Sequence, residues 1–247
     1  MLIKIAIMGV GRMGSLIRTT AEAVRDAEGN PAFEVVAQIG FDLAEAETAE
    51  VADVLIDFSN VATLPAVLAY VSRCGCALVS GTTGYAPEQL AALQDLGATV
   101  PVVWSGNYSI GVAALRHLTA QATRELPGFD VEIVECHHNQ KADAPSGTAK
   151  MLLDAVMDAK GDPDSHAVYG REGMCGARDP HEIGVHALRG GTVAGVHTVS
   201  FFGTDEEVSL THRATSRQIF VNGALAATTK LLDREAGFYT FDEIMFG

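Results

Sequence analysis

Short apolar runs alternate with helix-permissive stretches along the N-terminal part of the chain. The runs are continuous, which is typical of strands buried on both faces of a sheet. We expect strands at Leu2–Met8, Phe33–Ile39, Asp53–Phe58, Cys76–Ser80 and Thr99–Trp104. Helices are expected in the intervals, from the first glycines to about Ala27, at Leu64–Arg73 and at Pro87–Leu96. This alternation predicts βαβ units and a parallel sheet, with ligands at the carboxyl ends of its strands.

Beyond Trp104 the pattern changes to a mixture of helix and sheet. A helix is expected at Gly111–Leu126, a strand at Asp130–His138, and a second helix from Ser146 to about Lys160. A polar loop then leads to three extended segments, at residues 183–190, 196–203 and 206–214, the last two joined as a hairpin. The loop itself covers Gly161–Glu182.

These patterns predict an α/β chain of two domains. Residues 1–107 form the first, and residues 108–217 form a second domain of α+β type with a mixed sheet. Residues 218–247 are expected to complete the first domain, because the closing amphipathic helix at Ile219–Leu232 has an apolar face to bury. We expect no strand after that helix.

Charge and composition narrow the possible partners. The 247 residues include 31 acidic and 17 basic side chains, a formal charge of −14, which argues against nucleic acid and acidic membranes as partners. Hydrophobic residues make up 48%, as in globular proteins. The apolar run Ile5–Val10 is too short for a signal peptide or a membrane span, and the four cysteines show no paired framework. We therefore expect a cytoplasmic protein.

The first expected strand runs directly into a G-x-G-x-x-G sequence that opens a helix. Its glycines permit a tight turn, close approach of backbone N–H groups to a pyrophosphate, and close packing of helix on strand. The helix dipole also favours an anion there. We therefore expect a dinucleotide-binding domain of the Rossmann type, with the cofactor at Gly9-Val10-Gly11-Arg12-Met13-Gly14.

The end of the second expected strand normally distinguishes the two nicotinamide cofactors by their ribose. Here the sequence is Gln38–Asp42, without Arg or Lys. Asp42 can accept a hydrogen bond from a ribose hydroxyl and would repel the 2′-phosphate of NADPH. Alternatively, Asp42 is a solvated loop acid, and Arg12 could itself reach a phosphate. We predict a preference for NADH, or use of both cofactors.

Two further turns follow expected strands at the same edge of the sheet. Both offer small and hydroxyl residues whose backbone and side chains could contact a cofactor ring. Each is also compatible with an ordinary turn. They are Gly81-Thr82-Thr83-Gly84 and Ser105-Gly106-Asn107-Tyr108.

The densest group of polar residues lies in Glu135–Ala149. In the strand, Glu135 and His137 share one face with the apolar Val131 and Ile133. His137, His138 and Lys141 can each carry or transfer a proton. Proton donors at the end of a strand suit the reduction of an acidic substrate.

The helix that follows this strand is expected to add an anion site. Ser146 has the character of an N-cap, and the first turn behind it offers the N–H groups of Gly147 and Thr148. Such a turn can receive a substrate carboxylate.

Two other interpretations of this segment stay open. Cys136, His137 and His138 are zinc-ligand types, but strand neighbours point to opposite faces, so His137 cannot easily join the other two. No C-x-x-C or H-x-x-x-H spacing supplies the missing ligands, and we expect no metal. The third interpretation is a histidine pair with a purely structural role.

The segment Glu135–Ala149 follows the pattern E-x-H-H-x-x-K-x-D-A-P-S-G-T-A, by which the chain resembles the dihydrodipicolinate reductase family of bacterial lysine and diaminopimelate synthesis. The resemblance covers nearly the whole chain. Supporting segments are Gly11–Gly14, Asp57–Ser59, Gly81–Gly84, Asn107–Ser109, Gly176–Arg178 and Phe202–Thr204. It implies a Rossmann domain joined by hinges to a substrate-binding and oligomerisation domain, and an assembly that is usually a homotetramer.

The resemblance also implies a reaction and residue roles. NADH or NADPH would deliver hydride to the ring of a cyclic dicarboxylate imine, giving tetrahydrodipicolinate. His137 and Lys141 would be catalytic and transfer protons, while His138, Gly147 and Thr148 would hold the substrate carboxylates. The cofactor contacts would be Gly9–Met13, Gly81–Thr83 and Ser105–Tyr108.

Other functions remain open at this point. Another Rossmann-fold oxidoreductase, acting on a small carboxylated imine or aldehyde, would keep the glycine turn. A non-catalytic NAD(H)-sensing protein would need only the first domain. Cys136 lies beside two histidines, so a nucleophilic thiol is a further alternative. The His-His-x-x-Lys sequence before a Ser-Gly-Thr helix start favours the reductase.

Overall fold

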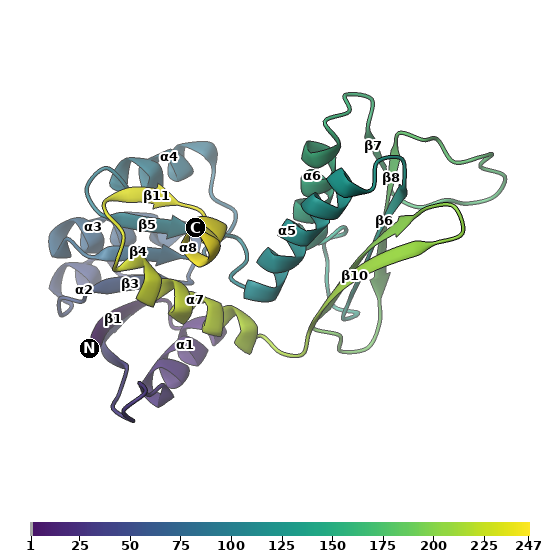
Figure 1. The fold of residues 1–247 in the computed structure, drawn as a ribbon. Helices are drawn as coiled ribbons and strands as arrows, with labels where there is room; N and C mark the ends of the chain where they lie inside the picture. The colour runs from purple at the N-terminus through teal and green to yellow at the C-terminus, as the bar shows by residue number, and fades with distance from the viewer. Residues whose placement is uncertain (1) are drawn as a thin grey trace. The chain divides into compact units, whose positions relative to one another are not determined.

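The computed structural model describes residues 2–247 and divides them into two compact units (Figure 1). One unit consists of the chain up to Ser109 together with Gln218–Gly247, and the other is Ile110–Arg217. No helix within the described residues has the length and apolar character of a membrane span.

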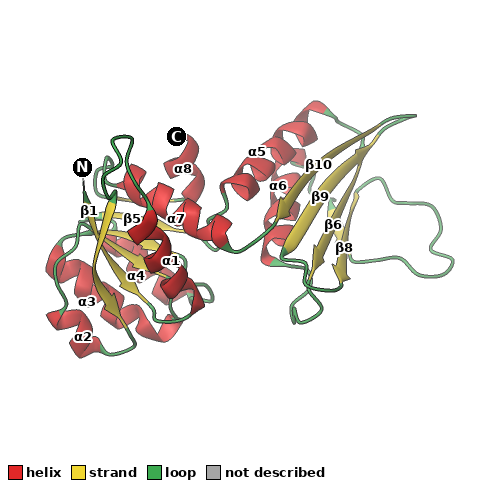
Figure 2. Cartoon of the chain, turned by 90° about the horizontal axis from the view of Figure 1, so that it is seen from below, coloured by secondary structure: helices red, strands yellow, loops and turns green. Residues whose placement is uncertain are grey.

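The first unit is a parallel sheet of six strands in the order β11-β5-β4-β3-β1-β2. Helices cover both of its faces, with α2, α3 and α4 on one side and α1, α7 and α8 on the other (Figure 2). The strands are β1 (Ile3–Met8), β2 (Phe33–Ile39), β3 (Val54–Asp57), β4 (Ala77–Ser80), β5 (Pro101–Trp104) and β11 (Gly237–Tyr239). The helices are α1 (Arg12–Ala23), α2 (Leu43–Thr48), the 3-10 helix η1 (Val61–Thr63), α3 (Leu64–Cys74), α4 (Pro87–Leu96), α7 (Gln218–Leu231) and α8 (Phe241–Phe246).

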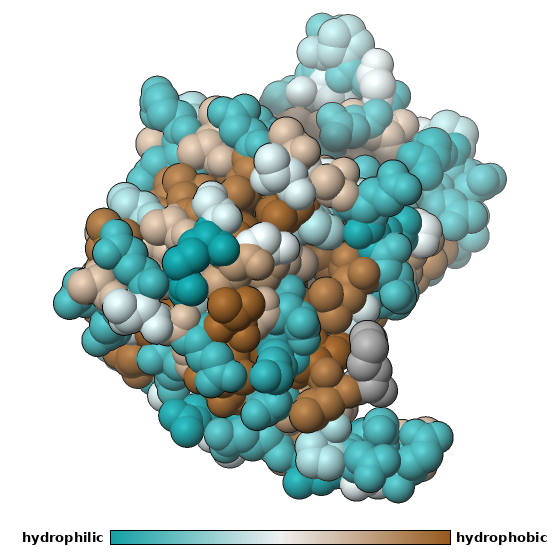
Figure 3. Space-filling view, turned by 90° about the vertical axis from the view of Figure 1, so that its left-hand side faces the viewer, coloured by the Kyte–Doolittle hydropathy of each residue, from teal (hydrophilic) through white to brown (hydrophobic). Residues whose placement is uncertain are grey.

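Burial on both faces explains why the strands of this unit are continuously apolar. Every residue of β3 and β4 is buried. The last residue of β3 is the polar Asp57, and that of β4 is the polar Ser80. Local signals set the helix ends: α3 stops at Gly75, which has φ +62°, and α4 begins at Pro87. On the outer surface of this unit, apolar and hydrophilic side chains are intermixed (Figure 3).

The second unit is a mixed sheet of five strands in the order β10-β9-β6-β8-β7. Its central strand β6 is parallel to β8 and antiparallel to β9. Both helices pack on one face, where they bury residues such as Ile133, Leu152 and Phe201 (Figure 2). The elements are α5 (Ile110–Glu125), β6 (Asp130–His137), α6 (Gly147–Lys160), β7 (His166–Val168), β8 (Glu182–Arg189), β9 (Gly195–Phe202) and β10 (Glu207–Ala214).

The predicted architecture, a parallel α/β sheet and a second mixed sheet, is confirmed. The closing helix α7 packs on α1 and on strands of the first sheet. The expectation that no strand follows it is wrong, because Gly237–Tyr239 pairs in parallel with β5 at the edge of the first sheet. The loop expected at residues 161–182 also contains the short strand β7, and the short helix α2 follows Asp42.

Candidate active site

The glycine-rich turn joins β1 to α1 in the first unit. Gly9 has φ +119°, and a Cβ there would lie 2.8 Å from the carbonyl oxygen of Phe58. A Cβ on Gly14 would collide with the carbonyl oxygen of Gly9, so only glycine lets α1 begin this close to the strand. Gly11 caps α1 without a side-chain hydrogen bond, and a Cβ on it would meet nothing within 4 Å. The open first turn therefore fits a dinucleotide pyrophosphate.

Two carboxylates lie at the carboxyl end of β2. Asp42 is the N-cap of α2, and its Oδ1 accepts the N–H of Ala44 at 2.9 Å. Glu45 Oε2 accepts the N–H of Gly40 at 2.8 Å, so a second acid reaches the end of the strand. Glu45 was missed by the sequence analysis, although Asp-x-x-Glu is the spacing of a helix N-terminus.

A buried carboxyl group fixes the turn that follows β4. Asp57 accepts hydrogen bonds from Ser59, from Ser80 Oγ at 2.8 Å and from Tyr85 at 3.2 Å. Burial raises the pKa of Asp57, against the opposing effect of these hydroxyl donors. Thr82 turns its hydroxyl inward to the N–H of Ser59 at 3.0 Å, so its side chain belongs to this network.

The turn after β5 lies beside the turn after β4. A Cβ on Gly106 would lie 3.7 Å from Thr83 Cγ2, and Thr83 is exposed. Ser105 Oγ and Asn107 close their own turn, with the Ser105 hydroxyl donating to the Asn107 carbonyl at 2.8 Å. Tyr108 is 1% exposed over the whole residue, and its hydroxyl donates to the Ser80 carbonyl at 2.8 Å. Tyr108 is therefore a buried support of this turn.

In the second unit, β6 places Glu135 and His137 at the end of the face that packs on the helices. The alternation of buried residues along β6 follows the predicted pattern. His137 Nδ1 lies 2.6 Å from Glu135 Oε2. The two residues thus form a hydrogen-bonded pair at the carboxyl end of the strand.

Glu135 is fully buried and has three further donors around it. The Arg189 guanidinium donates to both carboxylate oxygens at 2.8 Å, and the backbone N–H of Ser146 donates at 3.1 Å. Burial by itself raises the pKa of Glu135, but Arg189, His137 and the Ser146 N–H outweigh it and hold that pKa below its ordinary value. Glu135 is therefore ionised at neutral pH.

Lys141 lies in the loop between β6 and α6. Its Nζ contacts both carboxylate oxygens of Asp143, at 2.8 and 3.0 Å. The Lys141 ammonium lowers the pKa of Asp143. Arg189 also donates to the Asp143 carbonyl at 2.8 Å, which connects this loop to the Glu135 pair. His138 anchors the loop through its N–H, which donates to the Val193 carbonyl at 2.8 Å.

The start of α6 adjoins the same residues. Ser146 is its N-cap, as predicted, and its Oγ accepts the N–H of Ala149 at 3.2 Å. Gly147 is exposed, and a Cβ there would meet nothing within 4 Å. Ser146 Oγ also lies 3.0 Å from Nε2 of His197, a buried residue whose ring packs edge-on against that of His137.

The structure thus gathers His137, His138, Lys141 and the first turn of α6 at one end of the second sheet. Sequence analysis missed Arg189 and His197. The strand register is the feature that places both residues at the site. Arg189 of β8 pairs with His137 of β6, and His197 of β9 pairs with Glu135 of β6.

The zinc-ligand residue types Cys136, His137 and His138 lie at this end of the sheet. Among residues 2–247, the metal-ligand types that come close enough to share an ion are Asp162 and Asp164, before β7, and His181, directly before β8. Cys136 and His137 point to opposite faces of β6.

Together these features define a nicotinamide-dependent oxidoreductase built of two units. The chain belongs to the dihydrodipicolinate reductase family. Its residues 3–108 match the family model for the N-terminus of dihydrodipicolinate reductase, and residues 111–245 match the model for the C-terminus.

Curated relatives carry the name of this family's reaction, and solved structures share the fold. A 4-hydroxy-tetrahydrodipicolinate reductase from Exiguobacterium sp. strain AT1b is 41% identical, covering 97% of this chain and 94% of the relative. One from Brachyspira hyodysenteriae is 38% identical, covering 98% and 99%. The structure of dipicolinate-bound dihydrodipicolinate reductase from Paenisporosarcina sp. TG-14 matches with a TM-score of 0.79 and 24% identity, over 99% of this chain and 100% of that one. An amine dehydrogenase from Mycobacterium smegmatis shares the fold, with a TM-score of 0.62 at 12% identity over 97% and 95%.

Burial of His197 predicts that acid destabilises the fold. Burial, together with the nearby His137, lowers the pKa of His197 to about 4, whereas an unfolded histidine has a pKa of about 6.5. Between these values the unfolded chain takes up a proton that the folded chain does not, so stability is full above pH 6.5 and falls as the pH drops to 4. The loss amounts to about 3 kcal/mol. Urea unfolding at several pH values should show this loss in the wild type and a flatter profile in His197→Gln.

The control is His166→Gln, a substitution of an exposed histidine on β7. It should keep the wild-type pH dependence. An unchanged slope in His197→Gln would contradict the prediction.

Proposed function

We propose that this chain reduces dihydrodipicolinate (4-hydroxy-tetrahydrodipicolinate) to tetrahydrodipicolinate with NAD(P)H, in lysine and diaminopimelate synthesis. The observation that carries the proposal is the gathering of His137, Lys141 and the open first turn of α6 at one end of the second sheet. The relatives named for this activity support it. The Paenisporosarcina structure, described as dipicolinate-bound, shows that a relative of this fold holds a dicarboxylate of the same class.

Each unit has its own task in this proposal. NAD(P)H, when bound, supplies the hydride, and residues 9–14 hold its pyrophosphate through the first turn of α1. The turns at residues 81–83 and 105–108 contact the remainder of the cofactor. His138, Gly147 and Thr148 hold the substrate carboxylates, with the dipole of α6 adding to the attraction for negative charge.

His137 and Lys141 handle the protons. Hydride adds as a nucleophile, so cationic groups must polarise the ring, and the position left electron-rich must then take a proton. Lys141 is held near the site by Asp143 and can donate that proton. His137 is held by Glu135 and can exchange a proton through its imidazole ring.

Loss of either proton-transfer residue should reduce turnover strongly. General acid–base catalysis contributes on the order of a hundredfold to ten-thousandfold, so Lys141→Ala and His137→Ala should each lower kcat by about that factor. The measurement is NADH oxidation in a coupled assay with dihydrodipicolinate synthase. Lys160→Ala, in the last turn of α6, is the control and should retain full kcat. Wild-type turnover in Lys141→Ala would refute the lysine assignment.

The proposal extends to a preference for NADH. Asp42 and Glu45 both place carboxylates at the end of β2, where a 2′-phosphate would meet like charge. Two unit charges about 4 Å apart in water interact by about 1 kcal/mol. Neutralising one of these carboxylates should therefore change the affinity for a 2′-phosphate by roughly fivefold. The wild type should therefore show a lower KM for NADH than for NADPH.

The variants Asp42→Asn and Glu45→Gln should each lower the KM for NADPH by roughly fivefold and leave the KM for NADH nearly unchanged. Both replacements keep the hydrogen-bond acceptors, because Asn also caps helices and Gln retains a carbonyl oxygen. Glu34→Gln, at the opposite end of β2, is the control. A much lower wild-type KM for NADPH would contradict the preference.

The proposed assembly is a homotetramer formed through the second sheet, in the cytoplasm. The sheet face turned away from α5 and α6 carries the exposed Leu188 and Phe202 beside small hydroxyl residues. Cys74, Cys76, Cys136 and Cys175 are free thiols, which suits a reducing compartment.

Analytical ultracentrifugation should give the mass of four chains. Leu188→Lys should shift the distribution toward smaller species, because a charge in an apolar interface is costly to bury. Leu118→Lys changes an equally exposed leucine on α5 and should leave the mass unchanged. A monomeric wild type would exclude the tetramer.

A further inference from the structure

We infer that Glu135 is a positioning residue that fixes which ring nitrogen of His137 exchanges the proton, and that this nitrogen is Nε2. The inference rests on the proposed proton-transfer role of His137. It adds the residue that orients the ring, Glu135, and the ring atom that exchanges the proton, Nε2. Its basis is a buried carboxylate surrounded by groups that can only donate hydrogen bonds.

The hydrogen-bond donors around Glu135 determine which ring nitrogen of His137 carries a proton. The Arg189 guanidinium and the Ser146 N–H occupy both carboxylate oxygens, and neither group can accept a hydrogen bond. The carboxylate is therefore ionised and only accepts. The 2.6 Å contact must then be a hydrogen bond donated by His137 Nδ1–H. A neutral ring with its proton on Nδ1 has a bare Nε2 that accepts a proton, and a charged ring donates from that same atom.

The structure leaves room at His137 Nε2. A Cβ on Gly195 would lie 3.1 Å from this nitrogen, so the glycine at the start of β9 keeps the space beside it free of a side chain. The neighbouring His197 ring packs edge-on, with the ring centroids 5.2 Å apart, and its Nε2 is engaged by Ser146 Oγ. His197 therefore supports the ring of His137 without bonding to its Nε2.

Replacing Glu135 by Gln should reverse the tautomer. An amide nitrogen in the place of Oε1 would face two fixed donors, from Arg189 and the Ser146 N–H. In the place of Oε2 it would face one fixed donor, from Arg189, and His137, whose ring can move its proton. The amide nitrogen should therefore turn toward His137, which makes Nδ1 an acceptor and places the proton on Nε2.

A long-range ¹H–¹⁵N correlation spectrum of the ¹⁵N-labelled full-length protein reads this tautomer directly, at a pH where the ring is neutral. Wild type and Glu135→Asp should show the Nδ1–H form of His137, because both supply a carboxylate. Glu135→Gln should show the Nε2–H form. Its kcat should fall by at least about tenfold to a hundredfold, the range seen when a metal-ligating histidine loses the partner that orients it. Serine proteases lose about ten-thousandfold when the orienting Asp becomes Asn.

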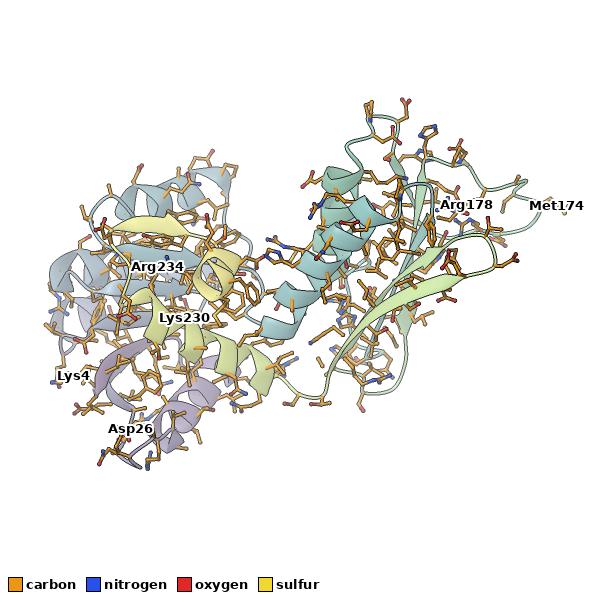
Figure 4. The ribbon with its side chains drawn as sticks, viewed as in Figure 1. Lys4, Asp26, Met174, Arg178, Lys230 and Arg234 are labelled. Atoms are coloured by element: carbon orange, nitrogen blue, oxygen red, sulfur yellow. The ribbon has the colours of Figure 1, made fainter. Side chains whose placement is uncertain are left out.

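The affinity for NADH should not change in Glu135→Gln, because the glycine-rich turn belongs to the other unit. The matched control is Glu132→Gln on the same strand. Glu132 accepts hydrogen bonds from Arg171, from Arg178 in the loop preceding β8 (Figure 4) and, at 2.8 Å, from His186, but it lies on the opposite face of β6. Glu132→Gln should keep the Nδ1–H form of His137 and its kcat.

An Nε2–H form of His137 in the wild type would overturn the inference, and that measurement needs no variant. Retention of both the Nδ1–H form and full kcat in Glu135→Gln would also overturn it. If Glu135→Gln does not fold, the wild-type and Glu135→Asp spectra decide. Absence of dihydrodipicolinate reduction by the wild type would instead contradict the proposed function, since the tautomer is read without turnover.

Discussion

The burial of one ionised carboxylate, Glu135, is the constraint on which the chemistry of the second unit depends. Taking a charge out of water costs several kcal/mol, and four hydrogen bonds from Arg189, His137 and Ser146 offset that cost. These donors come from β8, from β6 itself and from the start of α6. The carboxylate is satisfied only when sheet register and helix start are both native. The native arrangement of this unit therefore fixes the orientation of His137.

The first unit buries a carboxyl group too, with the opposite electrostatic outcome. Asp57 ends β3 as Glu135 approaches the end of β6, and both are fully buried. The donors to Asp57 are neutral hydroxyls, so burial prevails and its pKa rises, whereas a guanidinium and an imidazole hold the pKa of Glu135 down. The two buried carboxyl groups are therefore held by different means: neutral hydroxyl donors at Asp57, and a charged guanidinium at Glu135.

The sequence predicts β2 and α4 at the bounds that the structure has, because a continuous apolar run and a proline in the first turn are local signals. It predicts Ser146 as a cap for the same reason. The strand at Gly237–Tyr239 could not be predicted, because three residues are too few to show an alternation of apolar and polar positions. Only pairing with β5 makes them a strand. Arg189 and His197 could not be assigned to the site for a related reason. Their positions opposite His137 and Glu135 follow from strand order and register, which depend on the whole second unit.

The chain has an excess of acidic residues, yet the ligands of the proposed reaction are anions. The two are compatible because the cationic side chains near the proposed site differ in the strength of their ion pairs. Arg189 is bound to a buried carboxylate, and breaking such a pair costs about 3–5 kcal/mol, so it is not available to a substrate. Lys141, whose side chain is 19% exposed, is paired with Asp143, whose side chain is 61% exposed, and an ion pair with a solvated partner is weaker than one with a buried carboxylate. Lys141 can therefore leave Asp143 at less cost than Arg189 can leave Glu135. This difference supports the proposal that Lys141 transfers a proton to the substrate, whereas Arg189 holds the framework of the site.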